Sequence, residues 1–154
     1  MKMKKLLGCL LIVMVGIVAC EGPMGPPGKD AEFVRFTGDY DVYAGDWIPR
    51  IEEGDGYFFH YFEYEFRVPQ LTNYVFDKGF VGCYLVQKII YNQRENLVQR
   101  PLPYTIYGFN DFGEPYSENY SFETRPGYIK FIVKYSDFDE IQPLTCTFHV
   151  VMMW

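Results

Sequence analysis

Residues 57–68 read YFFHYFEYEFRV, and alternate side chains of this stretch differ in character. One set is aromatic or aliphatic throughout and consists of Phe58, His60, Phe62, Tyr64, Phe66 and Val68. The other set begins with aromatic residues and ends with charged ones, and it consists of Tyr57, Phe59, Tyr61, Glu63, Glu65 and Arg67. Because side chains of an extended chain point alternately to its two faces, the pattern predicts a long strand with one face in a core.

Turn chemistry recurs at short intervals on both sides of this strand. The turn signals are Asp55-Gly56, the NQREN segment at residues 92–96, the NDFGEPYSEN segment at residues 110–119, and Pro126-Gly127. Proline followed by glycine suits the middle of a type II turn. Residues 69–79 supply at most one helical turn, and no stretch keeps a period of 3.6.

Between these turns, apolar and polar side chains again alternate with a period of two. Strands are predicted at residues 57–68, 79–90, 102–109, 119–124, 127–135 and 145–154. The chain is therefore expected to be all-β, with a single antiparallel β-sandwich of six to seven strands and a flattened barrel as the alternative.

The first nineteen residues have the layout of a secretory signal peptide: a basic start, an apolar run over residues 6–18, and the small residue Ala19. The segment IVAC, which ends at Cys20, resembles the lipobox of bacterial lipoproteins. We therefore predict a lipoprotein signal peptide at residues 1–19 and lipidation of Cys20. The alternative is an ordinary secreted protein with a cysteine at its cleavage site. Two or more acyl chains would anchor the protein stably in a membrane.

Residues 20–30 read CEGPMGPPGKD, with Gly22, Gly25 and Gly28 at a strict period of three. Glycine at every third residue with proline between is the collagen signature. Three triplets are too few to hold a triple helix together, which favours a proline-stiffened spacer over a trimeric stalk. Residues 31–154 then form one domain that is large enough to bury a core.

The composition of the exported chain excludes one class of partner. Without residues 1–19 the chain keeps 11 basic and 20 acidic residues, a net charge of −9. An acidic protein repels phosphate backbones, so we expect no nucleic-acid partner. The 14 Tyr and 14 Phe residues are typical of half-buried strands and of carbohydrate-facing surfaces.

The lipobox cysteine and the Gly-Pro stub occur together with several longer segments. These are Trp47, VPQLTNYVFDKGFVGCYL at residues 68–85, LPYT at 102–105, PGYIKFIVKYSDF at 126–138 and FHVVMMW at 148–154. Together they resemble a family of small lipoproteins from Bacteroides-type bacteria, often labelled collagen-like because of the stub. The resemblance covers nearly the whole chain and implies an envelope location. It implies no catalytic residues, because the family has no established activity.

The sequence offers few ligands for a metal ion. His60 and His149 lie on different predicted strands, His60 on the apolar face and His149 on a more exposed face with Thr145 and Thr147. Zinc sites need three or four ligands at close spacing, and no such cluster is present in the sequence. We expect no metal and no cofactor.

Two groups of acidic residues are candidate sites. The segment GDYDVYAGDW carries Asp39, Asp41 and Asp46, and we expect a solvated, turn-forming loop there in preference to a calcium site. Glu63 and Glu65 share one strand face, which favours a solvated face over a glycosidase acid pair. No catalytic motif was found, and the chain is predicted not to be an enzyme.

Cys83 and Cys146 are the two thiols of the predicted domain. Both fall in predicted strands with apolar neighbours. In an oxidising compartment they would pair if their strands adjoin, whereas free buried cysteine is a common core residue. The sequence does not decide between a Cys83–Cys146 disulfide and two free buried thiols.

The sequence thus predicts a noncatalytic, lipid-anchored protein of the cell envelope, an outer-membrane lipoprotein with a structural or binding role. Whether it faces the periplasm or the surface is open, as is its oligomeric state. Its predicted partners are the membrane, through the N-terminal lipid, and a glycan or envelope protein. The alternative is a glycan-binding accessory module of a polysaccharide-uptake system, in which Tyr57, Phe59 and Tyr61 stack on sugar rings.

Overall fold

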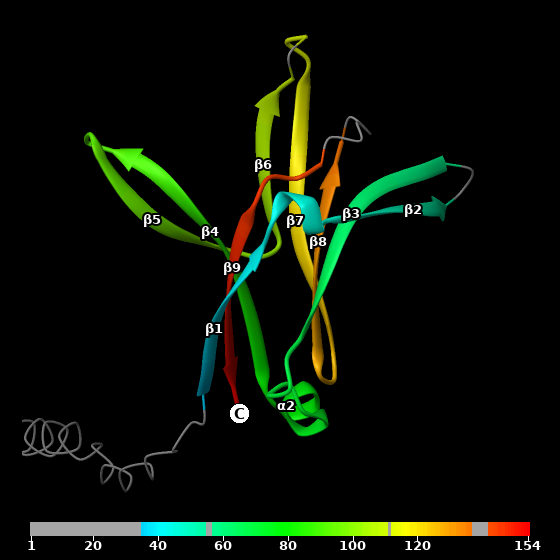
Figure 1. The fold of residues 1–154 in the computed structure, drawn as a ribbon, viewed down its shortest axis with the longest axis vertical. Helices are drawn as coiled ribbons and strands as arrows, with labels where there is room; N and C mark the ends of the chain where they lie inside the picture. Colours follow the sequence, from blue (N-terminus) through cyan, green and yellow to red (C-terminus); the bar gives the residue numbers. More distant parts are fainter. Residues whose placement is uncertain (1–34, 55–56, 111, 137–141) are drawn as a thin grey trace, which may run out of the picture. The chain divides into compact units, whose positions relative to one another are not determined.

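Four strands form one antiparallel sheet, five form a second, and the two sheets pack through a shared core (Figure 1). The computed structural model describes residues 35–54, 57–110, 112–136 and 142–154, and for residues 57–59 the backbone alone. Residues Phe33–Trp154 form one compact unit that contains the whole described core. The predicted all-β sandwich is confirmed. The predicted signal peptide at residues 1–19 and the spacer at residues 20–30 lie outside the described residues.

The strand order is β1-β9-β4-β5 in the first sheet and β2-β3-β8-β7-β6 in the second. The first sheet consists of β1 (Arg35–Val42), β9 (Cys146–Met153), β4 (Phe80–Tyr91) and β5 (Arg94–Pro101). The second consists of β2 (Ile48–Gly54), β3 (Tyr57–Arg67), β8 (Tyr128–Tyr135), β7 (Pro115–Arg125) and β6 (Tyr104–Phe109). A 3₁₀ turn, η1 (Ala44–Asp46), and a short helix, α2 (Asn73–Lys78), complete the described elements.

The described part of the chain has nine strands, more than the six or seven predicted. The additional strands are β1, β2 and β5, and each is the last strand at an edge of its sheet. β2 and β5 bury few side chains, so their period of two is weak in the sequence, whereas β1 does alternate over residues 35–42 and was missed because its aspartates favoured a loop. In β2 the second residue is Pro49, which has no N–H for a ladder and is tolerated at an edge.

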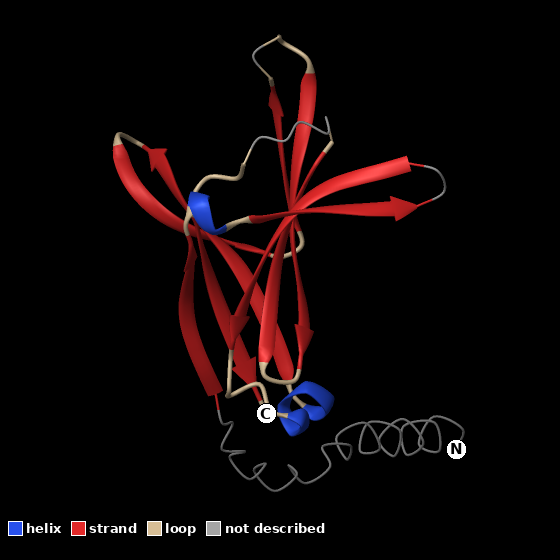
Figure 2. Ribbon diagram, turned by 45° about the vertical axis from the view of Figure 1, so that its right-hand side comes forward, coloured by secondary structure: helices blue, strands red, loops and turns tan. Residues whose placement is uncertain are grey.

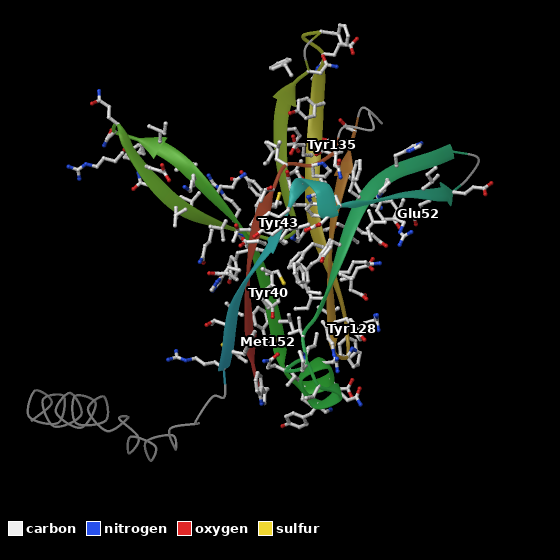
Figure 3. The ribbon with its side chains drawn as sticks, viewed as in Figure 1. Tyr40, Tyr43, Glu52, Tyr128, Tyr135 and Met152 are labelled. Atoms are coloured by element: carbon white, nitrogen blue, oxygen red, sulfur yellow. The ribbon has the colours of Figure 1, made fainter. Side chains whose placement is uncertain are left out.

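Aromatic rings join the two sheets in the core. Phe131 of β8 stacks on Phe148 of β9, with ring centroids 3.9 Å apart and an angle of 7° between the planes. Phe66 of β3 meets Phe131 edge-on at 6.2 Å. Tyr40 and Met152, labelled in Figure 3, lie on β1 and β9 of the opposite sheet, and the Tyr40 ring packs edge-on against Phe66 at 5.0 Å. Phe62, Tyr64, Phe66 and Val68 of the predicted inner face of β3 are therefore in the core or packed against it, whereas His60 lies outside the core cluster.

The structure contradicts the alternative of a disulfide between Cys83 and Cys146, because both thiols are free and buried. β4 and β9 do adjoin, but Cys83 lies opposite Val150, four residues along β9 from Cys146. At about 3.3 Å per residue the two positions are about 13 Å apart, well beyond the span that a disulfide bridges.

Two local predictions between strands are confirmed. Gly127 has φ +82° between β7 and β8, the left-handed conformation that a type II turn requires of its third residue. The predicted helical turn is α2, which begins after Thr72, whose hydroxyl accepts a hydrogen bond from the Val75 backbone N–H at 3.3 Å. Leu71 and Val75 are buried and attach this helix to the core.

Candidate functional site

Three β-hairpins extend beyond the two-layer core: β2–β3, β4–β5 and β6–β7 (Figure 2). They point away from the end of the domain that carries α2 (Figure 1). β1 starts at that same α2 end, because Arg35 pairs with Met153, which also pairs with Phe80 next to α2. The hairpin ends therefore lie at the opposite end of the domain from the first described residue. In Figure 3 no described element lies over the side chains drawn at the ends of the β4–β5 and β6–β7 hairpins.

The β6–β7 hairpin presents three aromatic rings to solvent. Tyr107 and Phe109 are 82% and 74% exposed and share one face of β6, and Phe112 in the connecting loop is 88% exposed. The opposite face of β6 turns Tyr104 and Ile106 toward the core. Large apolar side chains gathered on one element are unusual on a soluble surface and mark interaction sites.

The loop that carries Phe112 is held by Asn110. The Asn110 Oδ1 atom accepts hydrogen bonds from the backbone N–H groups of Phe112 and Glu114 at 3.1 and 2.9 Å. Its Nδ2 donates to a Glu114 carboxylate oxygen at 3.3 Å. Gly113 donates to the Asn110 carbonyl at 2.9 Å and adopts φ +79°. These bonds hold Phe112, Gly113 and Glu114 against Asn110, which lowers the entropic cost of binding through Phe112.

The hairpin is also braced from its inner face. A Cβ atom on Gly108 would lie 2.9 Å from the Tyr116 ring, so glycine allows that ring to cover the backbone. The Glu118 carboxylate accepts hydrogen bonds from the hydroxyls of Tyr116 at 3.1 Å and of Tyr120 at 2.7 Å. Burial, and next the bond to Glu118, raise the pKa of Tyr120 above its ordinary value, so its hydroxyl stays a donor. Because Tyr120 is in the core, this chain of contacts connects the hairpin to the sandwich.

The β4–β5 hairpin carries a second apolar group. Ile90, Tyr91 and Leu97 are 84%, 66% and 68% exposed. Lys88 Nζ binds a Glu95 carboxylate oxygen at 2.8 Å on the face that carries Ile90 and Leu97, whereas Tyr91 lies on the opposite face with Arg94. Asn92 and Gln93 form its tight turn with φ values of 50° and 61°, as a type I′ turn requires.

A cavity of about 420 Å³ lies along β2 and β3. It combines an aromatic phenol ring, an imidazole, a guanidinium and an amide with apolar walls. Its lining residues are Pro49, Arg50, Ile51, His60, Tyr61, Phe62 and Gln142. A cavity of this size and mixed lining is typical of small-ligand sites.

The predicted stacking platform is only partly described. The side chains of Tyr57 and Phe59 lie outside the described residues. Tyr61 is half-buried and lines the cavity, and Lys134 Nζ lies 5.3 Å from its ring centroid. Lys134 also binds Glu52, labelled in Figure 3 on β2, at 3.3 Å. One ring of the platform therefore already has a cationic neighbour.

Glu63 and Glu65 hold the outer face of the second sheet together. Glu63 accepts from Arg50 at 2.7 Å and lies 3.4 Å from Lys130 Nζ. Burial alone would raise the pKa of Glu63, but the hydrogen bond from Arg50 and the charge of Lys130 outweigh it and lower the pKa. Glu65 accepts two hydrogen bonds from Arg125, at 3.1 and 2.7 Å. The two carboxylates are ion-paired, which differs from the solvated face expected.

The acidic segment at residues 38–47 is a strand and a 3₁₀ turn, and the expectation of a loop throughout is wrong. Asp39 and Asp41 belong to β1 and contact β9: Asp39 binds His149, and Asp41 accepts from the Thr147 hydroxyl at 2.6 Å. Cross-strand partners therefore occupy these carboxylates. His149 is 22% exposed in its side chain, less open than expected. Among the described residues no three His, Cys, Asp or Glu side chains are grouped to hold a metal ion.

Sequence reasoning did not select Tyr107, Phe109 or Phe112. Their signal was the string YGFNDFGEPY, in which aromatic residues lie inside and next to a turn where no core can cover them.

The chain was compared with protein-family models, curated proteins and solved structures. No family model, curated protein or solved structure matches the chain. No helix among the described residues is long and apolar enough to cross a bilayer. Cys20, the predicted lipidation site, lies outside the described residues.

Proposed function

We propose that this chain is a noncatalytic, lipid-anchored protein of the bacterial cell envelope that binds a partner through its projecting hairpins. The observation that carries the binding role is the set of exposed rings of Tyr107, Phe109 and Phe112 on a hairpin ordered by Asn110 and Glu118. Rigid aromatic side chains bury a large area on contact at a small cost in entropy, and they dominate binding energy at interfaces.

The anchor in this proposal is supported by the lipobox-like IVAC segment and by the Gly-Pro spacer after it. The described residues place the hairpin ends opposite the end at which β1 begins. A domain tethered through the residues before β1 would then hold these ends free for a partner. We further propose the outer membrane as the location and Bacteroides-type lipoproteins as the relatives.

Fractionation tests the anchor. Cys20→Ala, expressed in a lipoprotein-processing bacterium, should move the protein from the membrane to the soluble fraction and abolish incorporation of labelled fatty acid. Cys9→Ala is the matched control, since it changes a cysteine within the same predicted signal peptide and should leave both readouts unchanged. Continued membrane association of the Cys20 variant would refute the anchor.

Photo-crosslinking in intact cells tests the hairpins. A photoreactive residue at Phe112 should give covalent adducts of defined mass, because this side chain is the most exposed of the three rings. Tyr74 on α2, 64% exposed at the opposite end, is the matched control position and should give none. Adducts from both positions in equal yield, or from neither, would contradict binding through the hairpins.

A glycan-binding accessory module is the second candidate, favoured by the cavity along β2 and β3. Tyr61 offers a ring, and Arg50 and Gln142 offer hydrogen-bonding groups, next to apolar walls. This combination suits a sugar, which has both C–H faces and hydroxyl groups. A glycan array followed by calorimetry on residues 21–154 tests it. Binding that Tyr61→Ala weakens would support this candidate, and no binding at millimolar sugar would exclude it.

A further inference from the structure

The β4–β5 and β6–β7 hairpins carry opposite charge. Residues 86–101 contain Lys88, Arg94 and Arg100 against one acid, Glu95. Lys88 and Glu95 pair with each other, which leaves a net positive hairpin. Arg94 is exposed at the turn, and no described side chain forms an ion pair with it. This hairpin is therefore basic at its end.

The β6–β7 hairpin is acidic over β6, its loop and the first four residues of β7. Residues 104–118 contain Asp111, Glu114 and Glu118 and no lysine or arginine. Glu118 is occupied by the two tyrosine hydroxyls, whereas Glu114 is exposed beside Phe112 and contacts only the neutral Asn110 side chain and backbone among described groups. The acidic and the basic hairpin thus each combine an exposed charge with exposed apolar side chains.

The two hairpins do not neutralise each other within one molecule. They diverge from the sandwich in both views (Figures 1 and 2), and no ion pair joins them among the described residues. β5 and β6 are also edge strands, so each leaves one side of its backbone without a strand partner. Opposite charge, apolar surface and free strand edges are therefore available to a second molecule.

We propose that the basic β4–β5 hairpin of one molecule packs against the acidic β6–β7 hairpin of a second copy of this chain. Arg94 then lies near Glu114 of the other copy, and Tyr91, the cross-strand neighbour of Arg94 on the same face of the hairpin, covers Phe112. The proposal rests on the proposed function, since it names a partner for the same hairpins. Anchoring would favour this contact, because tethered copies have a high effective concentration.

A charge exchange tests the contact on residues 21–154, which include the whole described core and lack Cys20. Sedimentation velocity over a range of protein concentrations should show a mass that rises above the monomer and falls again at high salt. Arg94→Glu or Glu114→Lys alone should each weaken self-association about tenfold, because like charges then face each other. The double variant exchanges the two charges and should recover the affinity.

Two further variants control for net charge, and one tests the apolar part. Arg35→Glu and Asp77→Lys make the same charge changes at exposed positions at the α2 end and should leave self-association unchanged. Phe112→Ser should weaken it by about tenfold through lost apolar contact. Thermal unfolding of each variant confirms that the fold is retained.

Two outcomes overturn the self-contact: a monomer at every concentration and salt, or a double variant as weak as the single ones. The crosslinking experiment separates this failure from failure of the proposed function. Adducts from Phe112 at twice the monomer mass support the self-contact. Adducts at other masses, with a monomer in sedimentation, leave the binding role standing and remove the second copy as partner.

Discussion

At the scale of single residues, the stacked rings of Phe131 and Phe148 join the two sheets. Both side chains are fully buried, and each belongs to a different sheet. A change at Phe131 therefore affects the packing of two layers at once.

Phe131→Leu should lower the free energy of unfolding by about 1–2 kcal/mol, because a smaller side chain loses the stack and leaves a gap. Phe112→Leu is the matched control: its ring is exposed, and the change should stay within about 0.5 kcal/mol. Urea unfolding of both variants measures the difference. Equal effects would show that the stack does not hold the sheets together.

The two core thiols allow a second prediction at this scale. Burial raises the pKa of Cys83 to about 12 and that of Cys146 to about 11, so both stay protonated near neutral pH. Since the thiolate is the reactive form, iodoacetamide at pH 8 should modify neither cysteine in the folded protein. In denaturant without reductant it should modify both, which mass spectrometry detects. If neither thiol is modified in the denatured protein, the result would contradict the free thiols and indicate a disulfide.

At the scale of elements, the β6–β7 hairpin depends on a glycine for its shape. Tyr116 covers the backbone at Gly108, and its hydroxyl reaches Glu118. None of the described elements covers its outer face, where Tyr107 and Phe109 are exposed. Its order therefore comes from contacts within the hairpin and at its base.

Gly108→Ala should cost about 1 kcal/mol of stability, because the Tyr116 ring must move and its bond to Glu118 is strained. Gly45→Ala is the matched control, since a Cβ atom there meets nothing within 4 Å. Denaturant unfolding compares the two. In a Tyr116→Ala background the cost of the Gly108 change should disappear, and a cost that persists would contradict the role of the ring.

At the scale of the whole molecule, ion pairs link β2, β3, β8 and β7 across the outer face of the second sheet. Glu63 connects Arg50 of β2 to Lys130 of β8, and Lys130 also binds Glu123 of β7 at 2.8 Å. The same face has Arg125 packed on the ring of Tyr128, labelled in Figure 3, with 3.7 Å to the ring centroid. This face is thus stabilised by charge where the inner face is stabilised by apolar packing.

Acid should weaken this network. The pKa of Glu63 is lowered in the folded protein from its ordinary 4.5, so its stabilising effect is present above pH 4.5 and is lost as pH falls through the folded value. Glu63→Gln should cost about 1 kcal/mol at pH 7, and the difference from wild type should shrink toward pH 3. Glu53→Gln changes an exposed carboxylate on β2 and is the control. Unfolding curves from pH 3 to 7 measure both, and a constant difference for Glu63→Gln would refute the linkage.

The sequence by itself determined the sandwich and the face of β3 that enters the core, because the alternation of side chains along residues 57–68 is a local property. It also determined the turn at Gly127 and the short helix α2, since both depend on residues next to one another. Three of the four edge strands were not predicted. Almost all side chains of β2 and β5 are exposed, and β1 pairs with β9, which is distant in the chain.

Only the tertiary structure decided the state of the cysteines and the place of the exposed rings. Cys83 and Cys146 lie in adjacent strands, yet the register of β4 and β9 keeps them apart. Tyr107, Phe109 and Phe112 have the composition of core residues, and they are exposed because their hairpin extends past the layer that would cover them. The register of β4 with β9 and the length by which the β6–β7 hairpin extends beyond the core depend on the tertiary structure. A local sequence pattern does not contain this information.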